Sequence, residues 1–182
     1  WKHDLSSKAV FINKDNITKL IKEEGFHKDL GILHIDLDGN DYYIWEAINI
    51  VEPIVVIVEY NSIFGKDRTI SVPYDDNFIR TNAHYSNLYF GTSIHSLYQL
   101  GIKKGYRFIG CNNAGNNAYF VRKDKLNDIV KEVQLSEGYV ESKYRESRNK
   151  KGSLSLLSKK EARGLLKGIS VFNTNLDKME KF

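Results

Sequence analysis

The chain has 182 residues, of which 41% are hydrophobic and 12% aromatic, enough to fill the core of one domain. It carries 27 basic and 23 acidic residues, and no apolar run approaches the roughly 20 residues that a membrane-spanning helix needs. Cys111 is the only cysteine, which excludes an internal disulfide. These properties exclude a transmembrane protein and predict a cytoplasmic one.

The first half of the chain alternates between short apolar runs and segments of helical spacing. Five consecutive apolar residues after Pro53 give the strongest strand pattern, and such continuity is typical of a strand buried on both faces, as in a parallel sheet. The elements expected here are a strand at 8–13, a helix from Asp15 or Asn16 to Gly25, a strand at 31–37, a helix starting near Asn40 or Asp41, and a strand at 54–60.

Residues 61–92 form a long polar connection with a short strand at 69–72, and a connection of this length within a domain is usually functional. Two further strands flank an Asn- and Gly-rich turn, which is typical of a hairpin. The remaining expected elements are a helix at 93–105, strands at 106–111 and 118–123, a helix from Asp124 to Val133, and a helix near 158–167.

This order predicts an α/β sheet that is mostly parallel and ends in an antiparallel hairpin. We expect one domain at 1–135 and a basic carboxyl-terminal extension at 136–182. Nine Lys and Arg but only two acids lie at 143–168, a composition that attracts phosphate groups or remains a solvated tail. Aromatic residues are sparse there, so a nucleic-acid partner is not expected.

Polar side chains gather where two of the expected strands end, and ligands of open α/β sheets bind at such ends. Asp36 lies near the tip of the strand at 31–37 and Asp38 directly after it, and Glu59 lies near the tip of the strand at 54–60. Close carboxylates favour a bound Mg²⁺ ion or a general base among them. His84, in the long connection, is a candidate acid–base group. The alternative is that Asp38 and Asp41 cap a helix while Asp36 and His84 face solvent.

Several segments together resemble the later part of bacterial FkbM-like methyltransferases. The resemblance covers about residues 8–125 and rests on GILHIDLDGNDYYIWEAI, PIVVIVEYN and GYRFIGCNNAGNNAYFVRKD, in that order. It implies a Rossmann-like methyltransferase sheet whose amino-terminal part is missing or truncated, S-adenosylmethionine as cofactor, and O-methyl transfer to a small-molecule or sugar-type acceptor. The charge of the basic segment with Arg145 and Arg148 predicts a phosphorylated or nucleotide-sugar acceptor, because arginine pairs bidentately with phosphate.

The resemblance and the local chemistry assign roles to residues of this chain. Candidate catalytic residues are Asp36, Asp38 and His84. Candidate cofactor-binding residues are His34, Asp36 and Gly39. Candidate substrate-binding residues are Glu59, Asn61, Arg145 and Arg148. Candidate magnesium ligands are Asp36, Asp38 and Glu59.

The chain departs from the family pattern because no glycine-rich turn precedes Gly39. Such a turn normally holds the cofactor. One alternative is therefore a non-catalytic or degenerate Rossmann-like binding domain. A second is a Mg²⁺-dependent phosphohydrolase, with Asp36 as nucleophile and Asp38 as acid–base group. Asn40 stands where the usual pattern of such enzymes has Thr or Val.

Overall fold

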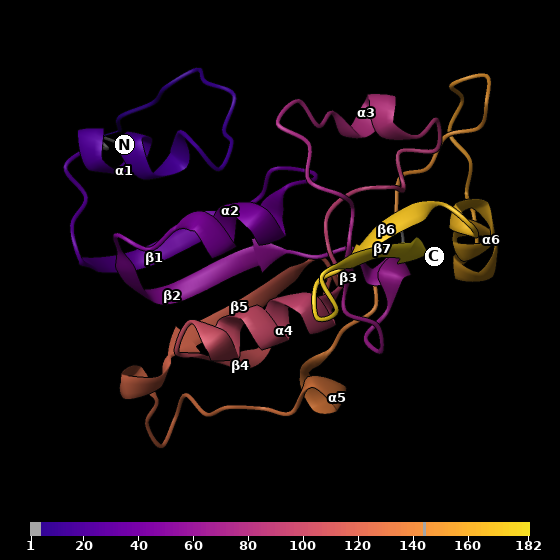
Figure 1. Ribbon diagram of the computed structural model, residues 1–182. Coiled ribbons are helices and arrows are strands. Elements are labelled where there is room, and N and C mark those ends of the chain that lie inside the picture. Colours follow the sequence, from indigo (N-terminus) through magenta and orange to yellow (C-terminus); the bar gives the residue numbers. More distant parts are fainter. Residues whose placement is uncertain (1–4, 144) are drawn as a thin grey trace.

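A four-stranded sheet forms the centre of the computed structural model, which describes residues 5–143 and 145–182 (Figure 1). The strand order is β1-β2-β5-β4. Strands β1 and β2 are parallel, whereas β5 is antiparallel to both of its neighbours. The strands are β1 (Asp29–Ile35), β2 (Glu52–Glu59), β4 (Tyr106–Cys111) and β5 (Asn117–Arg122).

The expectation of a mostly parallel Rossmann-like sheet is wrong. The hairpin forms where it was expected, but β5 inserts between β2 and β4 and makes two of the three strand pairings antiparallel. The reversal takes place in the Asn-rich turn, where the side chain of Asn112 accepts hydrogen bonds from the backbone N–H groups of Gly115, Asn116 and Asn117. The turn thus delivers β5 directly beside β2.

Six helices and two short 3₁₀ turns complete the described chain. Helices α2 and α4 lie on the same face of the sheet, where Trp45 and Gly101 meet Phe120 of β5 (Figure 1). The helices are α1 (Ile17–Glu23), α2 (Asp41–Ala47), α3 (Arg80–Ala83), α4 (Ile94–Lys103), α5 (Leu135–Gly138) and α6 (Lys159–Leu166), and the 3₁₀ turns are η1 (Ser62–Phe64) and η2 (Lys123–Lys125).

A second, smaller sheet has the order β3-β6-β7 and is antiparallel throughout. It joins β3 (Ile70–Ser71), β6 (Ser170–Asn173) and β7 (Lys178–Lys181). Together with α6 and η1 it encloses a second hydrophobic cluster that includes Phe64, Leu166 and Val171. The segment 136–182, expected to be an extension, therefore contributes core residues.

Three other expectations fail locally. Residues 8–13 form no strand, and β2 is buried on one face only, since Val56 and Val58 are fully buried but Ile54 is 39% exposed. The helix expected at 124–133 is limited to η2. Beyond it, the side chain of Asn127 accepts hydrogen bonds from the N–H groups of Ile129 and Val130, a local turn that competes with helix formation.

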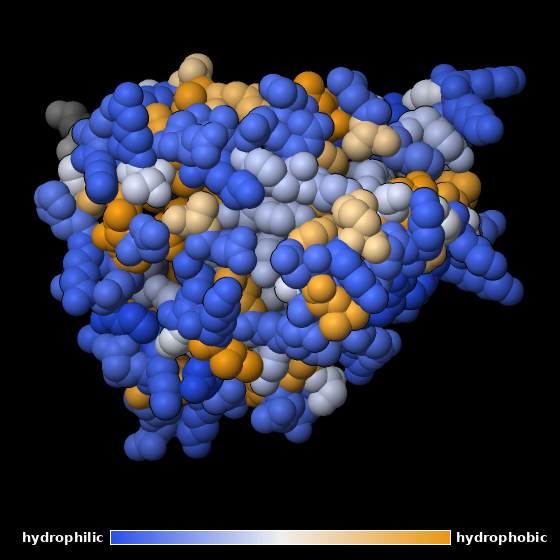
Figure 2. All heavy atoms as spheres, in the orientation of Figure 1, coloured by the Kyte–Doolittle hydropathy of each residue, from blue (hydrophilic) through white to orange (hydrophobic). Residues whose placement is uncertain are grey.

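The face of the molecule shown in Figure 2 is mainly polar, and hydrophobic side chains occur there in small separate groups among hydrophilic ones. Among the described residues, no helix is long and apolar enough to cross a membrane.

Candidate functional site

The carboxyl ends of β1 and β2 lie side by side, as the sequence predicts. His34 pairs with Ile57 and Ile35 with Val58 in parallel register, so the segments that follow Ile35 and Val58 leave the same edge of the sheet. A cleft of about 610 Å³ lies nearby, and its walls include Leu37, Asp38, Phe78, Arg80, Asn87 and Arg145. The expected site is thus present as a cleft, although most of its walls come from later segments.

Asp41 organises the turn that follows β1. It is fully buried, and its carboxylate accepts hydrogen bonds from the N–H groups of Leu37 at 2.8 Å and Gly39 at 3.0 Å. Burial raises the pKa of Asp41 to about 6. Asp41 therefore fixes the turn through backbone groups that precede the helix, whereas the alternative interpretation of the sequence had Asp38 and Asp41 cap the helix.

Asp38 is held by Arg80 of α3. The turn places Asp38 at a φ of 54°. Its Oδ1 accepts a hydrogen bond from Nη1 of Arg80 at 2.6 Å, and Nε of Arg80 donates to the carbonyl of Asn87 at 2.8 Å. The guanidinium of Arg80 stacks 3.8 Å from the centre of the buried Phe90 ring. No sequence pattern indicates this role of Arg80, because Arg80 lies 42 residues from Asp38.

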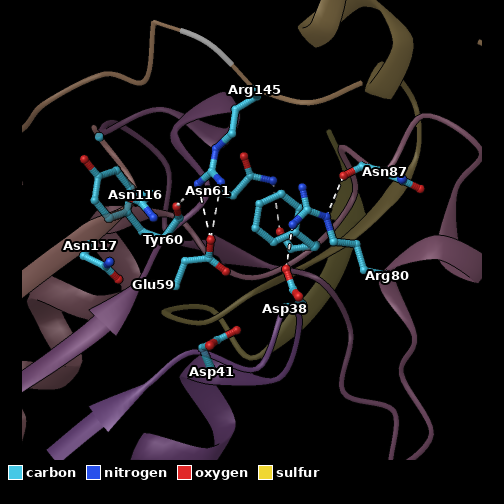
Figure 3. A network of polar contacts seen from close by, with 12 residues as sticks. Asp38, Asp41, Glu59, Tyr60, Asn61, Arg80, Asn87, Asn116, Asn117 and Arg145 are labelled. Carbon is cyan, nitrogen blue, oxygen red and sulfur yellow. Dashed lines mark hydrogen bonds and ion pairs between the residues drawn. The ribbon is translucent and has the colours of Figure 1, made fainter. Parts of the chain in front are cut away.

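Glu59 is the buried acid of the site, only 5% exposed at the end of β2. Its Oε1 faces Nη1 and Nη2 of Arg145 at 3.4 and 3.5 Å, longer than the roughly 2.8 Å of a strong charge-assisted bond. Its Oε2 is buried without a hydrogen-bond partner. Figure 3 shows Arg145 reaching toward Glu59 and Arg80 toward Asp38, with Asp41 apart from both pairs.

The surroundings of Glu59 favour its neutral form. Burial raises its pKa to about 7, the nearby cation of Arg145 acts in the opposite direction, and three acids raise it further, namely Asp41, Asp36 and Asp38. Its cross-strand neighbour Asn117 also has a buried side-chain oxygen without a partner. Buried polar atoms are normally hydrogen-bonded, so such a pair of oxygens indicates a place for a donor from a ligand or water.

Asn61, a predicted substrate-binding residue, is fully engaged within the protein. Its Nδ2 donates to the carbonyls of Leu88 and Phe90 at 2.9 and 3.0 Å, and its Oδ1 accepts from the N–H of Ile63. Asn61 therefore ties the long connection to the end of β2, and it positions Phe90 beneath the two arginines.

Several other predicted site residues lie away from the cleft wall. His34 and Asp36 are exposed on the outer strand β1 and the turn after it, and neither side chain makes a hydrogen bond or ion pair within the described chain. His84 bonds Ser86 at 2.7 Å, and burial lowers the pKa of its ring. Arg148 turns back to Glu146 at 2.7 Å. Of the predicted residues, only Asp38 and Arg145 are among the described residues that line the cleft.

Gly39, a predicted cofactor-binding residue, is covered by an aromatic ring. A Cβ atom at Gly39 would lie 2.2 Å from the Phe78 side chain, so the Phe78 ring fits there because Gly39 has no side chain. Within residues 5–143 and 145–182, no strand leads into a glycine-rich turn that could hold S-adenosylmethionine. The described residues thus do not fit the cofactor as a whole, and we derive no reaction step through it.

The described part of the chain contains no group of three or more His, Cys, Asp or Glu residues arranged to hold a metal ion. Comparison of the chain with family models, with curated proteins and with solved structures finds no match.

Proposed function

We propose that this chain carries the acceptor-binding part of an S-adenosylmethionine-dependent O-methyltransferase that acts on a hydroxyl group of a small-molecule or sugar-type acceptor. One observation carries the proposal, namely the buried carboxyl of Glu59 with an oxygen that has no partner. The identity of the methyl donor rests on the resemblance of residues 8–125 to FkbM-like methyltransferases.

Glu59 suits the role of proton acceptor. A general base works best with a pKa near the operating pH, and burial raises the pKa of Glu59 to about 7. Its free Oε2 would accept the hydrogen bond of the acceptor hydroxyl and then its proton. Asn117 Oδ1, on the neighbouring strand, would accept from a second donor on the same ligand.

Arg145 covers Glu59 and lines the cleft. Its guanidinium also donates to the carbonyl of Tyr60 at 3.3 Å, and its Nε is buried without a partner. Because its bonds to Glu59 are long, this side chain is the group we expect to move when an acceptor enters. In this proposal Asp38 keeps Arg80 oriented at the opposite side of the cleft and is not the base.

No observation favours the phosphohydrolase alternative. It would need Asp38 as a free acid–base group, but Asp38 is held by Arg80 at 2.6 Å. Measurements of cofactor binding and methyl transfer distinguish the methyltransferase hypothesis from that of a non-catalytic binding domain.

The test combines binding and transfer. Calorimetry with S-adenosylhomocysteine is performed on this chain and on any longer native protein that contains it. Transfer of labelled methyl groups from S-adenosylmethionine to a panel of sugars and sugar phosphates follows. We expect Glu59→Gln to reduce transfer roughly 100-fold or more, the usual contribution of a general base.

Glu52→Gln is the matched control, because Glu52 begins the same strand and is exposed. It should retain full transfer. Absence of both cofactor binding and transfer in every form would overturn the proposal in favour of a non-catalytic domain.

A further inference from the structure

Arg80 and Arg145 approach the same aromatic ring from segments far apart in the sequence. The guanidinium carbons lie 3.8 and 5.2 Å from the centre of the Phe90 ring, which is itself fully buried. Both side chains line the 610 Å³ cleft. Stacking on a ring fixes the plane of a guanidinium group and leaves its N–H edges free for a ligand.

Each of the two arginines has N–H groups that are not hydrogen-bonded, or only weakly so, to the described residues. Nε and Nη1 of Arg80 are used by Asn87 and Asp38, and Nη2 has no hydrogen bond within the described chain. Arg145 holds Glu59 only at 3.4 and 3.5 Å, and its Nε has no partner. Figure 3 shows the two guanidinium groups between the strand ends below and the segment that carries Arg145.

The acids of the cleft do not cancel this charge. Glu146, which also lines the cleft, is occupied by Arg148, at 2.7 and 3.0 Å from Nη2 and Nε. Asp38 balances one of the two cations, and Glu59, whose pKa burial raises to about 7, balances the other only in part at neutral pH. The cleft therefore retains positive charge at neutral pH and presents several N–H donors, the combination that binds tetrahedral oxyanions.

We propose that Arg80 and Arg145 form a receptor for the phosphate group of a phosphate monoester, bound in the cleft over Phe90. The statement that this ester is the methyl acceptor rests on the proposed function, whereas the phosphate site does not. On binding, Arg145 exchanges Oε1 of Glu59 for the phosphate and leaves the Glu59 carboxyl free to meet the same ligand. The phosphate thus places the hydroxyl of the same molecule beside the carboxyl that takes its proton.

The experiment measures binding of methyl phosphate and of sulfate to the chain by calorimetry at low salt, with acetate as a carboxylate probe. We expect both tetrahedral anions to bind and acetate to bind at least tenfold more weakly. Arg80→Gln and Arg145→Gln should each weaken methyl phosphate binding roughly tenfold, because each removes charged hydrogen bonds. Lys151→Gln, which replaces an exposed cation of the same segment outside the cleft lining, should leave binding unchanged.

Circular dichroism of each variant establishes that it is folded, and Arg80→Lys keeps the charge but loses the paired donors. If Arg80→Gln binds methyl phosphate as well as the unaltered chain, or acetate binds as tightly as methyl phosphate, the phosphate site is wrong. If methyl phosphate binds as expected but no phosphate ester is methylated, the phosphate site stands and the proposed function fails.

Discussion

The acids Asp38, Asp41 and Glu59 at the strand ends differ in the donors that surround them. Asp41 receives two backbone N–H groups and Asp38 a close guanidinium, whereas Glu59 receives only long bonds from Arg145. A carboxylate removed from water without close donors favours its protonated form. Burial alone therefore does not mark Glu59 as the reactive group, but burial with an unused oxygen does.

Replacement of Glu59 by Gln should stabilise the fold in a pH-dependent manner. The pKa of Glu59 is raised from 4.5 to about 7, so the folded state binds a proton more tightly than the unfolded chain. Its contribution to stability is present below pH 4.5 and is lost as the pH rises through 7. Glu59→Gln should thus match the unaltered protein at pH 4 and exceed it by roughly 3 kcal/mol at pH 8.

Urea unfolding between pH 4 and pH 8 measures this difference. Asp41, Asp36, Asp38 and Arg145 are the charged groups that act on Glu59, and they remain in both proteins. Glu52→Gln, at an exposed position of the same strand, is the matched control. If the difference in unfolding free energy between Glu59→Gln and the unaltered protein does not change with pH, Glu59 is hydrated and ionised in the folded protein.

Replacement of Asp41 by Ala should destabilise the turn after β1. The change leaves the buried N–H groups of Leu37 and Gly39 without an acceptor, and each such loss costs about 1–3 kcal/mol. Asp41→Asn should lose less, because its carbonyl oxygen keeps one of the two bonds. Chemical denaturation at pH 8 compares the two variants, and equal losses would contradict a role as acceptor for both groups.

Residue patterns predicted which strand ends would meet but not which cations would face them. The run at 31–37 and the run at 54–60 are visible in the sequence, and their parallel pairing follows from the intervening helix. Arg145 is separated from Glu59 by 86 residues. Nothing local to either residue specifies that contact, since it depends on how the segment between α5 and α6 crosses the sheet.

Elements with strong local chemistry formed where the sequence predicted them. Ser93 accepts a hydrogen bond from the N–H of Ser96 and begins α4, and Ser158 forms a capping box with Glu161 at the start of α6. The hairpin of β4 and β5 follows its Asn-rich turn. The expected helix at 124–133 failed because side-chain turns there replace helical hydrogen bonds, and apolar spacing alone does not reveal this competition.

Gly101 allows α4 to approach the sheet, and Gly101→Ala should lower stability. A Cβ atom there would lie 2.8 and 2.9 Å from the Phe120 ring and 3.2 Å from Trp45. Overpacking of this kind costs about 1–3 kcal/mol, more than the gain in helix propensity. Thermal unfolding should show a lower melting temperature.

The matched control is Gly164→Ala in α6, where a Cβ atom would meet nothing within 4 Å. Because alanine favours the helical conformation, this variant should gain about 0.5–1 kcal/mol. Equal effects of the two substitutions would show that α4 is not closely packed on β5.

At the scale of the whole molecule, two hydrophobic clusters are joined by a strand that contributes side chains to both. The larger cluster lies between the central sheet and helices α2 and α4, and the smaller one between η1, α6 and the small sheet. Strand β6 connects them, since Val171 belongs to the smaller cluster and Phe172 packs against the larger one. The sequence did not predict this connection, because β3 and β6 are about 100 residues apart and the pairing has no local pattern.

Because β6 contributes to both clusters, we expect the two clusters to unfold together. Leu166 is fully buried in the smaller cluster, and Leu166→Ala should cost about 2–5 kcal/mol. In a Trp1→Phe background, Trp45 reports on the larger cluster, where it packs against Phe120. If the clusters are coupled through β6, the urea midpoint seen by Trp45 fluorescence should fall together with that seen by circular dichroism. A Trp45 transition that stays in place while circular dichroism shifts would instead show two units that unfold independently, and Arg145 would then be able to leave Glu59 without loss of the central sheet.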